Sequence, residues 1–176
     1  WLEQGCRCIY TGKFINIQSL FSEEKVDFEH TIPRSISFDN SLSNLTVCDA
    51  HFNRTVKKNQ IPSQLPKDLY DDILTRIQPW MAKVKTLEDN IEYYKLQSKR
   101  AQDKERKDYC IRQRHLWELE LDYWQKKVNA FKIKEVTSGF RNSQLNDTRI
   151  ITKYAYHYLK TIFNKVDVQN GRYTAD

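Results

Sequence analysis

The sequence predicts an α+β fold in which a small unit of short strands precedes a long helical extension. Short apolar runs between turn-forming residues fill positions 1–66, a pattern typical of short strands and loops. Apolar residues at spacings of three and four follow over positions 67–137 and predict helices. Positions 138–176 combine a further helical pattern with Asn170-Gly171, a strong hairpin signal. We therefore expect three regions, 1–66, 67–137 and 138–176.

The first region is expected to present two carboxylates on one face of a strand. Apolar and acidic residues alternate over 26–29, so the side chains of Asp27 and Glu29 point to the same side. Thr11-Gly12 can turn a hairpin ahead of this strand. A second strand over 45–48 and a short helix from about residue 49 would complete a strand–strand–helix unit.

The second region is expected to form a helical hairpin. Two apolar stripes repeat at coiled-coil spacing, one made of Val84, Leu87, Ile91 and Tyr94, the other of Trp117, Leu121, Trp124, Val128 and Phe131. Their aromatic residues are expected to pack between helices rather than to stack on nucleic-acid bases. Positions 98–108 between the stripes have almost no apolar residue, so they form either the turn of the hairpin or an exposed stretch of one continuous helix.

The third region is expected to contain one helix and one hairpin. Asp147 or Thr148 can cap a helix that carries apolar residues over 150–162. Short strand-like runs over 166–168 and 172–174 flank the Asn170-Gly171 turn. Because a lone hairpin does not make a stable sheet, we expect sequence outside this chain to complete it.

The composition favours a polyanionic partner and a reducing compartment. The net charge is +6, and basic residues that neutralise phosphates release condensed counterions, although this charge alone does not establish nucleic-acid binding. The cysteines, Cys6, Cys8, Cys48 and Cys110, are scattered and too few for a secreted disulfide scaffold, so reduced thiols are expected. No apolar run approaches the roughly 20 residues of a membrane span. We expect a cytoplasmic protein with no membrane partner.

Residues that can hydrolyse a phosphodiester gather between positions 27 and 54. The reaction requires an activated water, a cation and a fixed line of attack. His30 can accept a proton near neutral pH, since its unperturbed pKa is about 6.5. Glu29 and Asn53 offer the oxygen ligands that Mg²⁺ prefers, and Asp27 is a further ligand, directly or through water. The strand–strand–helix unit would bring His30 and Asn53 face to face.

The loop before the second strand is expected to orient His30. Asn44 would tie this loop to His30 by a bond from its side chain to the backbone, which would fix the imidazole ring. Each of these residues also has a simpler interpretation. A histidine beside an acid is usually just hydrogen-bonded, and an asparagine at a helix start is usually a cap. Their joint occurrence in one order and spacing favours an active site.

The segment 8–62, with CIYTGK, DFEHTIPRS, DNSLSN and FNRTVKKNQIP, resembles the HNH nuclease domain of the large RNA-guided DNA endonucleases of type II CRISPR systems. The segment 138–176, with SGFRNSQLNDTRIITKYAYHYLK and VDVQNGRYTAD, resembles the linker to the third segment of their RuvC-like domain. The resemblance implies a ββα-metal (HNH) nuclease core over 1–66, a helical extension over 67–137, and a linker with the start of that RuvC-like segment over 138–176.

The resemblance also implies roles for single residues. His30 would be the general base, Glu29 the metal-binding acid, Asn44 the loop asparagine and Asn53 the metal-binding asparagine. The residue before the histidine is often Asp in this family, so the longer Glu29 leaves open whether ligation is shared with Asp27. The implied cofactor is Mg²⁺, with Mn²⁺ as a substitute.

Structural zinc is not expected, because Cys6-Arg7-Cys8 lacks the spacing of a Cys-x-x-Cys ligand pair. In the whole enzyme the implied partners are a guide RNA, the target DNA and the RuvC-like domain of the same polypeptide, within the bacterial cytoplasm. The HNH domain would cut the DNA strand paired with the guide, a division of labour known for this family. Basic residues near the site are expected to hold phosphates without reading sequence, namely Arg34, Arg54, Lys57 and Lys58.

Two other functions remain open at this point. A stand-alone HNH homing or restriction endonuclease should carry a sequence-reading helix or a zinc ribbon, and the sequence shows neither. Alternatively, the chain is a non-enzymatic nucleic-acid-binding or protein-binding module, in which the helical hairpin makes the contacts and the HNH-like residues are structural.

Overall fold

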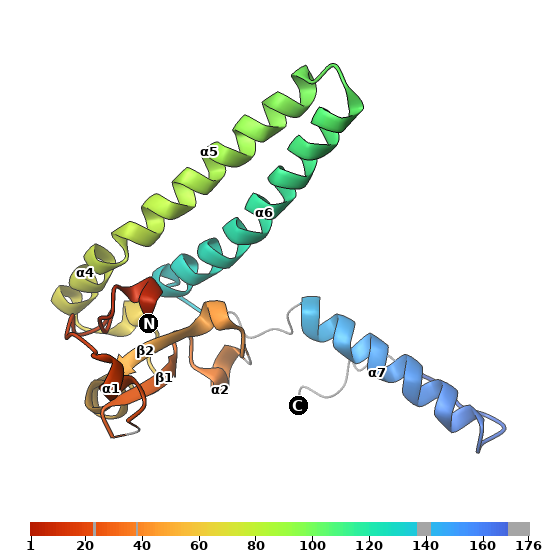
Figure 1. Ribbon diagram of the computed structural model, residues 1–176. Helices are drawn as coiled ribbons and strands as arrows, with labels where there is room; N and C mark the ends of the chain where they lie inside the picture. The colour runs from red at the N-terminus through yellow and green to blue at the C-terminus, as the bar shows by residue number, and fades with distance from the viewer. Residues whose placement is uncertain (23, 38, 137–141, 169–176) are drawn as a thin grey trace. The chain divides into compact units, whose positions relative to one another are not determined.

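The structure, a computed structural model, describes residues 1–22, 24–37, 39–136 and 142–168, with side chains from 142 to 150 left out (Figure 1). Two compact units divide the chain, one over Trp1–Val136 and one over Thr137–Asp176. The first unit joins a strand–strand–helix core to a helical extension, so the mixed α and β class predicted from the sequence is confirmed.

The core of the first unit is a two-stranded antiparallel sheet. Strand β1 (Val26–His30) pairs with β2 (Leu45–Asp49) in a register that sets Asp27 opposite Cys48 and Glu29 opposite Thr46. Helix α3 (Ala50–Phe52) follows β2 directly and runs on into η3 (Asn53–Lys57), a short π-helical segment. The Asp49 side chain caps this turn by accepting a hydrogen bond of 2.9 Å from the Phe52 backbone N–H. Both predicted strands and the predicted helix start are confirmed.

The predicted hairpin around Thr11-Gly12 is shorter than expected. A single bridge joins Arg7 to Phe14, and the turn requires a positive φ of 72° at Gly12. A Cβ atom at Gly12 would lie 3.0 Å from the Nε atom of Arg76, so the close approach of Arg76 also favours glycine there. Other short helical elements fill the connections, namely η1 (Leu2–Gln4), α1 (Ile17–Leu20), α2 (Arg34–Ser37), η2 (Leu42–Asn44) and η4 (Pro62–Gln64).

The helical extension contains α4 (Lys67–Arg76), α5 (Gln78–Arg100) and α6 (Lys104–Lys132), and the last two form the predicted hairpin (Figure 1). Pro79 lies in the first turn of α5, where its missing N–H is tolerated, and α4 ends just before it. Residues between Arg100 and Lys104 form the turn, and Asp103 caps α6 by accepting a 2.7 Å bond from the backbone N–H of Arg106. The segment 98–108 is therefore a turn with two helix ends, not one continuous helix.

An aromatic cluster fixes the base of this hairpin to the sheet. The Tyr10 ring stacks on Phe52 at 5.6 Å and contacts Phe131 at 5.7 Å. Trp80 packs edge-on against Phe131 at 5.7 Å and in a tilted arrangement against Trp124 at 6.0 Å. The packing role predicted for the aromatic residues of the second stripe is thus confirmed for Trp124 and Phe131.

A buried lysine adds a polar tie between the hairpin and the sheet. Lys127 of α6 is 3% exposed, and its ammonium donates to the Leu45 carbonyl at 2.9 Å and to the Tyr123 hydroxyl at 3.1 Å. It also pairs with the Glu3 carboxylate at 3.2 Å. A buried ammonium is costly without such partners. The charge therefore holds α6, the start of β2 and the N-terminal turn in one arrangement.

The second unit contains helix α7 (Asn142–Lys160). This helix begins several residues before the start predicted from a cap at Asp147 or Thr148. The hairpin predicted around Asn170-Gly171 lies outside the described residues. Within the described part of the chain, no helix combines the length and the apolar character needed to cross a membrane.

Candidate active site

The open face of β1 brings Asp27 together with Asn53 and Arg54. The Asn53 amide donates to Asp27 Oδ2 at 2.9 Å. The Arg54 guanidinium forms a two-point contact with the same carboxylate, Nε to Oδ2 at 3.1 Å and Nη2 to Oδ1 at 2.6 Å. The contact exists because α3 and η3 fold back across β1 and present the first residues of η3 to the strand. Asp27 thus lies at a partly open surface, where its side chain is 17% exposed.

These contacts keep Asp27 ionised. Partial burial alone would raise the pKa of its carboxyl, but the hydrogen bonds from Arg54 and Asn53 and the charge of Arg54 outweigh it, and the pKa is lowered. An ionised carboxylate beside an amide oxygen is a donor set that suits a hard divalent cation.

Glu29 does not lie at this open surface. It is 3% exposed, and Oε2 accepts hydrogen bonds from the Tyr10 hydroxyl at 2.9 Å and the Thr46 hydroxyl at 2.8 Å. Its other oxygen, Oε1, forms an ion pair with Lys57. Burial and the charge of Glu29 raise the pKa of Tyr10, so the phenol stays a donor. Glu29 is therefore enclosed, whereas Asp27 lies at the partly open surface, and this difference in burial favours Asp27 over the sequence-based choice of Glu29 as the direct metal ligand.

Lys57 is the buried partner of Glu29. Its side chain is 1% exposed, and its ammonium also donates to the backbone carbonyl of His30 at 3.1 Å. A lysine enclosed in this way cannot reach the phosphate backbone, so the prediction that Lys57 binds nucleic acid is wrong. Instead, Lys57 ties η3 to the end of β1. The other three predicted phosphate-binding residues, Arg34, Arg54 and Lys58, are exposed.

His30 ends β1, with its ring at the surface and partly exposed. The ring nitrogen Nε2 lies 2.9 Å from Oδ1 of Asn40. An amide oxygen only accepts, so in the neutral ring Nε2 carries the hydrogen and Nδ1 is left with the free lone pair. Asn40 was not singled out from the sequence.

Asn44 closes the loop between the strands, as predicted, but through a different partner. Its side chain forms a pair of 2.9 Å hydrogen bonds with the backbone N–H and C=O of Ile32, and its amide also donates to the Asp39 carbonyl at 2.9 Å. The expected bond to His30 is therefore replaced by bonds to a residue two positions further along the chain. Asn44 is 2% exposed, so it fixes the loop from inside, while Asn40 contacts the ring.

The stretch with this geometry matches a known family. Residues 8–63, which include both strands, the closed loop and η3, match the family described as HNH endonuclease. We refer to residues 8–63 as the HNH domain, after the family that they match. The nuclease class predicted from the sequence is thereby confirmed.

The chain is also similar to part of a larger enzyme. Over 99 residues the chain is 33% identical to the CRISPR-associated endonuclease Cas9 1 of Streptococcus thermophilus (strain ATCC BAA-491 / LMD-9). The aligned stretch covers 54% of this chain and 9% of that protein. The chain therefore spans only a small part of the length of this relative.

Within the HNH domain the predicted residues form two separate groups. Asp27 and Asn53 share one group with Arg54, and His30 forms the other with Asn40. His30 and Asn53, expected to meet directly, each have a different partner. Lys57 connects the groups, because it lies on the same segment as Asn53 and bonds to the backbone of His30.

The side chains around Asp27 are compatible with Mg²⁺ rather than with a protein cage for a softer metal. Among the described residues, no group of three or more His, Cys, Asp or Glu side chains is placed to hold a metal ion. Mg²⁺ is usually held by one or two protein oxygens and keeps several waters, so one carboxylate and one amide suffice. Asp27 and Asn53 fit this requirement.

Proposed function

We propose that this chain is the HNH nuclease segment of an RNA-guided effector, and that it hydrolyses a phosphodiester of the target DNA strand paired with the guide. The observation that carries the proposal is the geometry of His30 within the HNH domain, whose Nε2 is tied to Asn40 and whose Nδ1 is left to accept a proton. The similarity to the Cas9 relative supports the RNA-guided context, with the guide RNA, the target DNA and the RuvC-like part of the same polypeptide as partners. Location in the bacterial cytoplasm and connection through 138–176 stay predictions.

His30 acts as the general base in this proposal. A neutral imidazole with its hydrogen on Nε2 can take a proton from water through Nδ1, and the contact with Asn40 stabilises the same ring after it becomes cationic, since Nε2 still donates. The backbone of His30 is fixed by its pairing in the sheet and by the bond from Lys57 to its carbonyl. These contacts restrict the orientation of the ring.

Asp27 and Asn53 would hold the divalent cation, Mg²⁺ or Mn²⁺. When bound, the cation supplies positive charge for the phosphoryl and leaving oxygens. The residues of this chain then act around it. Asp27 provides the anionic oxygen, Asn53 provides the neutral one, and Arg54 adds a guanidinium beside them that can contact a phosphate.

The buried residues below this surface position it. Glu29 and Lys57 form an ion pair that joins β1 to η3, and Thr46 and Tyr10 complete the bonding of Glu29. Removing a partner of such a pair leaves a buried charge uncompensated. Arg34 and Lys58, which are exposed near the site, are proposed to hold the DNA backbone together with Arg54.

Cleavage is expected to require Mg²⁺ or Mn²⁺ and no bound zinc. EDTA should stop target-strand cleavage without changing the far-ultraviolet circular dichroism, because the structure is held by packing and ion pairs rather than by the metal. Added Mg²⁺ should restore the activity. The check is a cleavage assay of the whole enzyme with guide RNA, together with metal analysis of the purified protein. Stoichiometric zinc, or unfolding by EDTA, would contradict this assignment.

Replacing Asp27 by asparagine is expected to raise the Mg²⁺ concentration for half-maximal cleavage by about 10 to 100-fold or more, the range seen for losses around metal sites. Glu29→Gln should shift that concentration less and should mainly lower stability, because Glu29 is buried against Lys57. The measurement is the cleavage rate across a Mg²⁺ titration. Glu24→Gln, an exposed change of the same type, is the matched control. A larger Mg²⁺ shift for Glu29→Gln would show that Glu29 is the ligand after all.

A stand-alone homing or restriction nuclease remains the second candidate, since the HNH family match alone does not distinguish it. The two functions differ in what directs the cut. A guided effector should cleave only DNA complementary to its guide RNA, whereas a stand-alone nuclease should cleave a fixed sequence without RNA. Mg²⁺-dependent cleavage that is independent of added guide would favour the second candidate.

A further inference from the structure

The far end of the helical hairpin carries a net positive charge almost as large as that of the whole chain. We define the hairpin tip as residues 95–114, the last part of α5, the turn and the first part of α6. It holds eight Lys and Arg and three Asp and Glu, a net charge of +5, against +6 for the whole chain. The other hairpin segments are different. Residues 78–94 hold two Lys and three acids, and residues 115–132 hold three of each.

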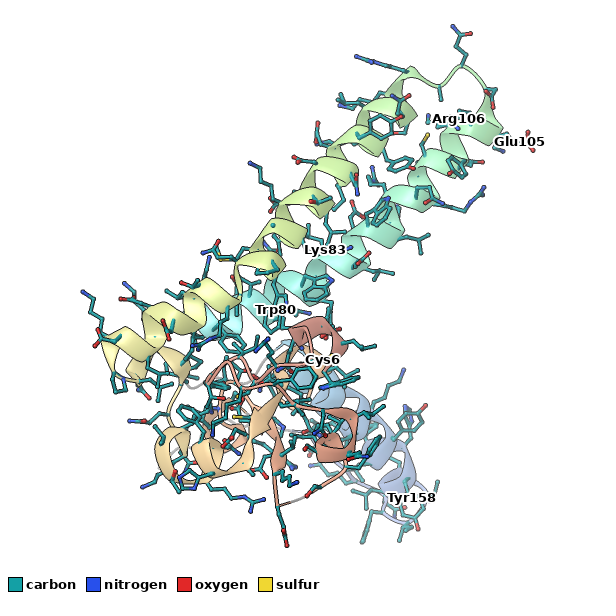
Figure 2. All side chains as sticks on the ribbon, turned by 60° about the vertical axis from the view of Figure 1, so that its left-hand side comes forward. Cys6, Trp80, Lys83, Glu105, Arg106 and Tyr158 are labelled. Carbon is teal, nitrogen blue, oxygen red and sulfur yellow. The ribbon has the colours of Figure 1, made fainter. Side chains whose placement is uncertain are left out.

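These basic side chains point into solvent. Seven of the eight are exposed, namely Lys95, Lys99, Arg100, Lys104, Arg106, Lys107 and Arg112. Figure 2 shows Arg106 and Glu105 at the end of the hairpin away from the sheet, whereas Trp80 lies where the hairpin meets it. In the described structure the ion pairs that involve tip bases are Lys95 with Glu92 and Arg114 with Glu118. Most of the charge is therefore available to an external partner.

Tyrosines lie beside this charge. Tyr93 and Tyr109 are 52% and 39% exposed, and their rings contact Tyr94 edge-on at 5.2 and 6.5 Å. The Arg106 guanidinium lies over the Tyr109 ring, 5.4 Å from its centroid. Hydroxyl groups of tyrosine and the charges of lysine and arginine are the donors that proteins use on phosphate oxygens. The tip thus combines cations with one partly exposed tyrosine, Tyr109, and a second one, Tyr93, lies just outside it.

The tip is far from the candidate active site. Helix α5 has 23 residues, and at 1.5 Å per residue it spans about 35 Å. Its base is fixed to the HNH domain by Trp80, Phe131 and the buried Lys127. A contact at the tip therefore reaches nucleic acid well outside the segment at the scissile bond, while the position of the base relative to His30 is set by the fold.

We propose that the hairpin tip binds the phosphate backbone of a nucleic-acid duplex, as a second contact surface that is separate from the HNH site. The inference rests on the proposed function, which supplies the nucleic acid. A net charge of +5 over 20 residues, with eight bases against three acids, favours a polyanion over an ordinary protein surface, where the two signs are nearly balanced. The contacts are to the backbone, so the binding is independent of base sequence.

The test is the salt dependence of binding by the 176-residue chain. The tip variant carries Lys99→Gln, Arg100→Gln, Lys104→Gln and Lys107→Gln. A control variant carries Lys67→Gln, Lys85→Gln, Lys132→Gln and Lys134→Gln, which are exposed lysines outside the tip. Both lose four charges, so total charge is matched. The probe is a fluorescent 30-base-pair DNA duplex of mixed sequence, titrated by anisotropy in EDTA over a series of KCl concentrations.

Each phosphate contact contributes about 0.9 to the slope of log affinity against log salt. The tip variant is expected to lose about 3 to 4 from this slope and at least about tenfold in affinity near 0.15 M salt. The control variant should keep most of the wild-type slope. An RNA–DNA hybrid of the same length should give the same ranking. Circular dichroism checks that both variants keep the helix content of the wild type.

Two results would overturn the proposal. An unchanged slope in the tip variant would mean that the tip does not contact phosphates, which would leave an acidic protein surface as its partner. Equal losses in both variants would mean that only total charge matters. Because binding is measured in EDTA and without cleavage, a failure of the nuclease proposal appears separately, as absence of Mg²⁺-dependent cleavage with a normal salt slope.

Discussion

Replacing His30 by alanine is expected to lower target-strand cleavage by at least about 10² to 10⁴-fold, the usual effect of losing a general base, while the protein stays folded. The ring lies at the surface at the end of β1 and its contact is to Asn40, so its removal leaves no cavity in the core. The measurement is the single-turnover rate of the complete enzyme with guide RNA at saturating Mg²⁺.

The matched change is Asn40→Ala, which leaves the ring in place but removes the acceptor for Nε2. It should cause a smaller loss than His30→Ala, because the ring can still take up a proton but is less well oriented. The other DNA strand, cut elsewhere in the proposed enzyme, should be cleaved normally by both variants. Unchanged target-strand cleavage by folded His30→Ala protein would remove this residue from the mechanism.

Replacing Lys57 by methionine is expected to destabilise the fold by about 3–5 kcal/mol, because the Glu29 carboxylate would remain buried without its cation. The backbone carbonyl of His30 would also lose a donor. Methionine keeps a long unbranched side chain, so the change tests the charge more than the volume. The measurement is urea unfolding of the 176-residue chain, followed by circular dichroism.

Lys58→Met is the control, because Lys58 is the neighbouring residue and is exposed. It should alter the free energy of unfolding by no more than about 0.5 kcal/mol. The double variant Glu29→Gln with Lys57→Met should be more stable than the sum of the single losses predicts, since it removes both charges of the pair. If Lys57→Met is no more destabilising than Lys58→Met, the ion pair does not stabilise the HNH domain.

The parts of the fold that follow from local periodicity could be predicted from the sequence. Alternation over 26–29 places Asp27 and Glu29 on one face of β1, as the register confirms. The apolar spacings of three and four predict the α5–α6 hairpin. Its turn, which the sequence left open, lies before α6, where Asp103 caps the helix. These features depend on neighbours in the chain, so a short window of sequence carries them.

The burial of one acid and the exposure of the other could not be predicted in the same way. Periodicity puts Asp27 and Glu29 on one face but does not say which of them the folded-back segment covers. That depends on Tyr10, Thr46 and Lys57, which lie 19, 17 and 28 positions from Glu29. The basic run 54–58 likewise does not show which lysine is internal. One signal was present, since Lys57 follows Asn53 by about one helical turn and so faces the same strand.

The Lys127 contact has a mechanical consequence. Its ammonium bonds to the carbonyl at which β2 begins, one residue after Asn44, which closes the loop beside His30. Pulling α6 away from the sheet would strip a buried cation of its acceptors, so small forces displace the hairpin and the loop together rather than apart. The α5–α6 hairpin and the loop between β1 and β2 are therefore expected to move as one body. A force applied at the hairpin tip, about 35 Å from its base, is therefore expected to reach the backbone of the loop beside His30.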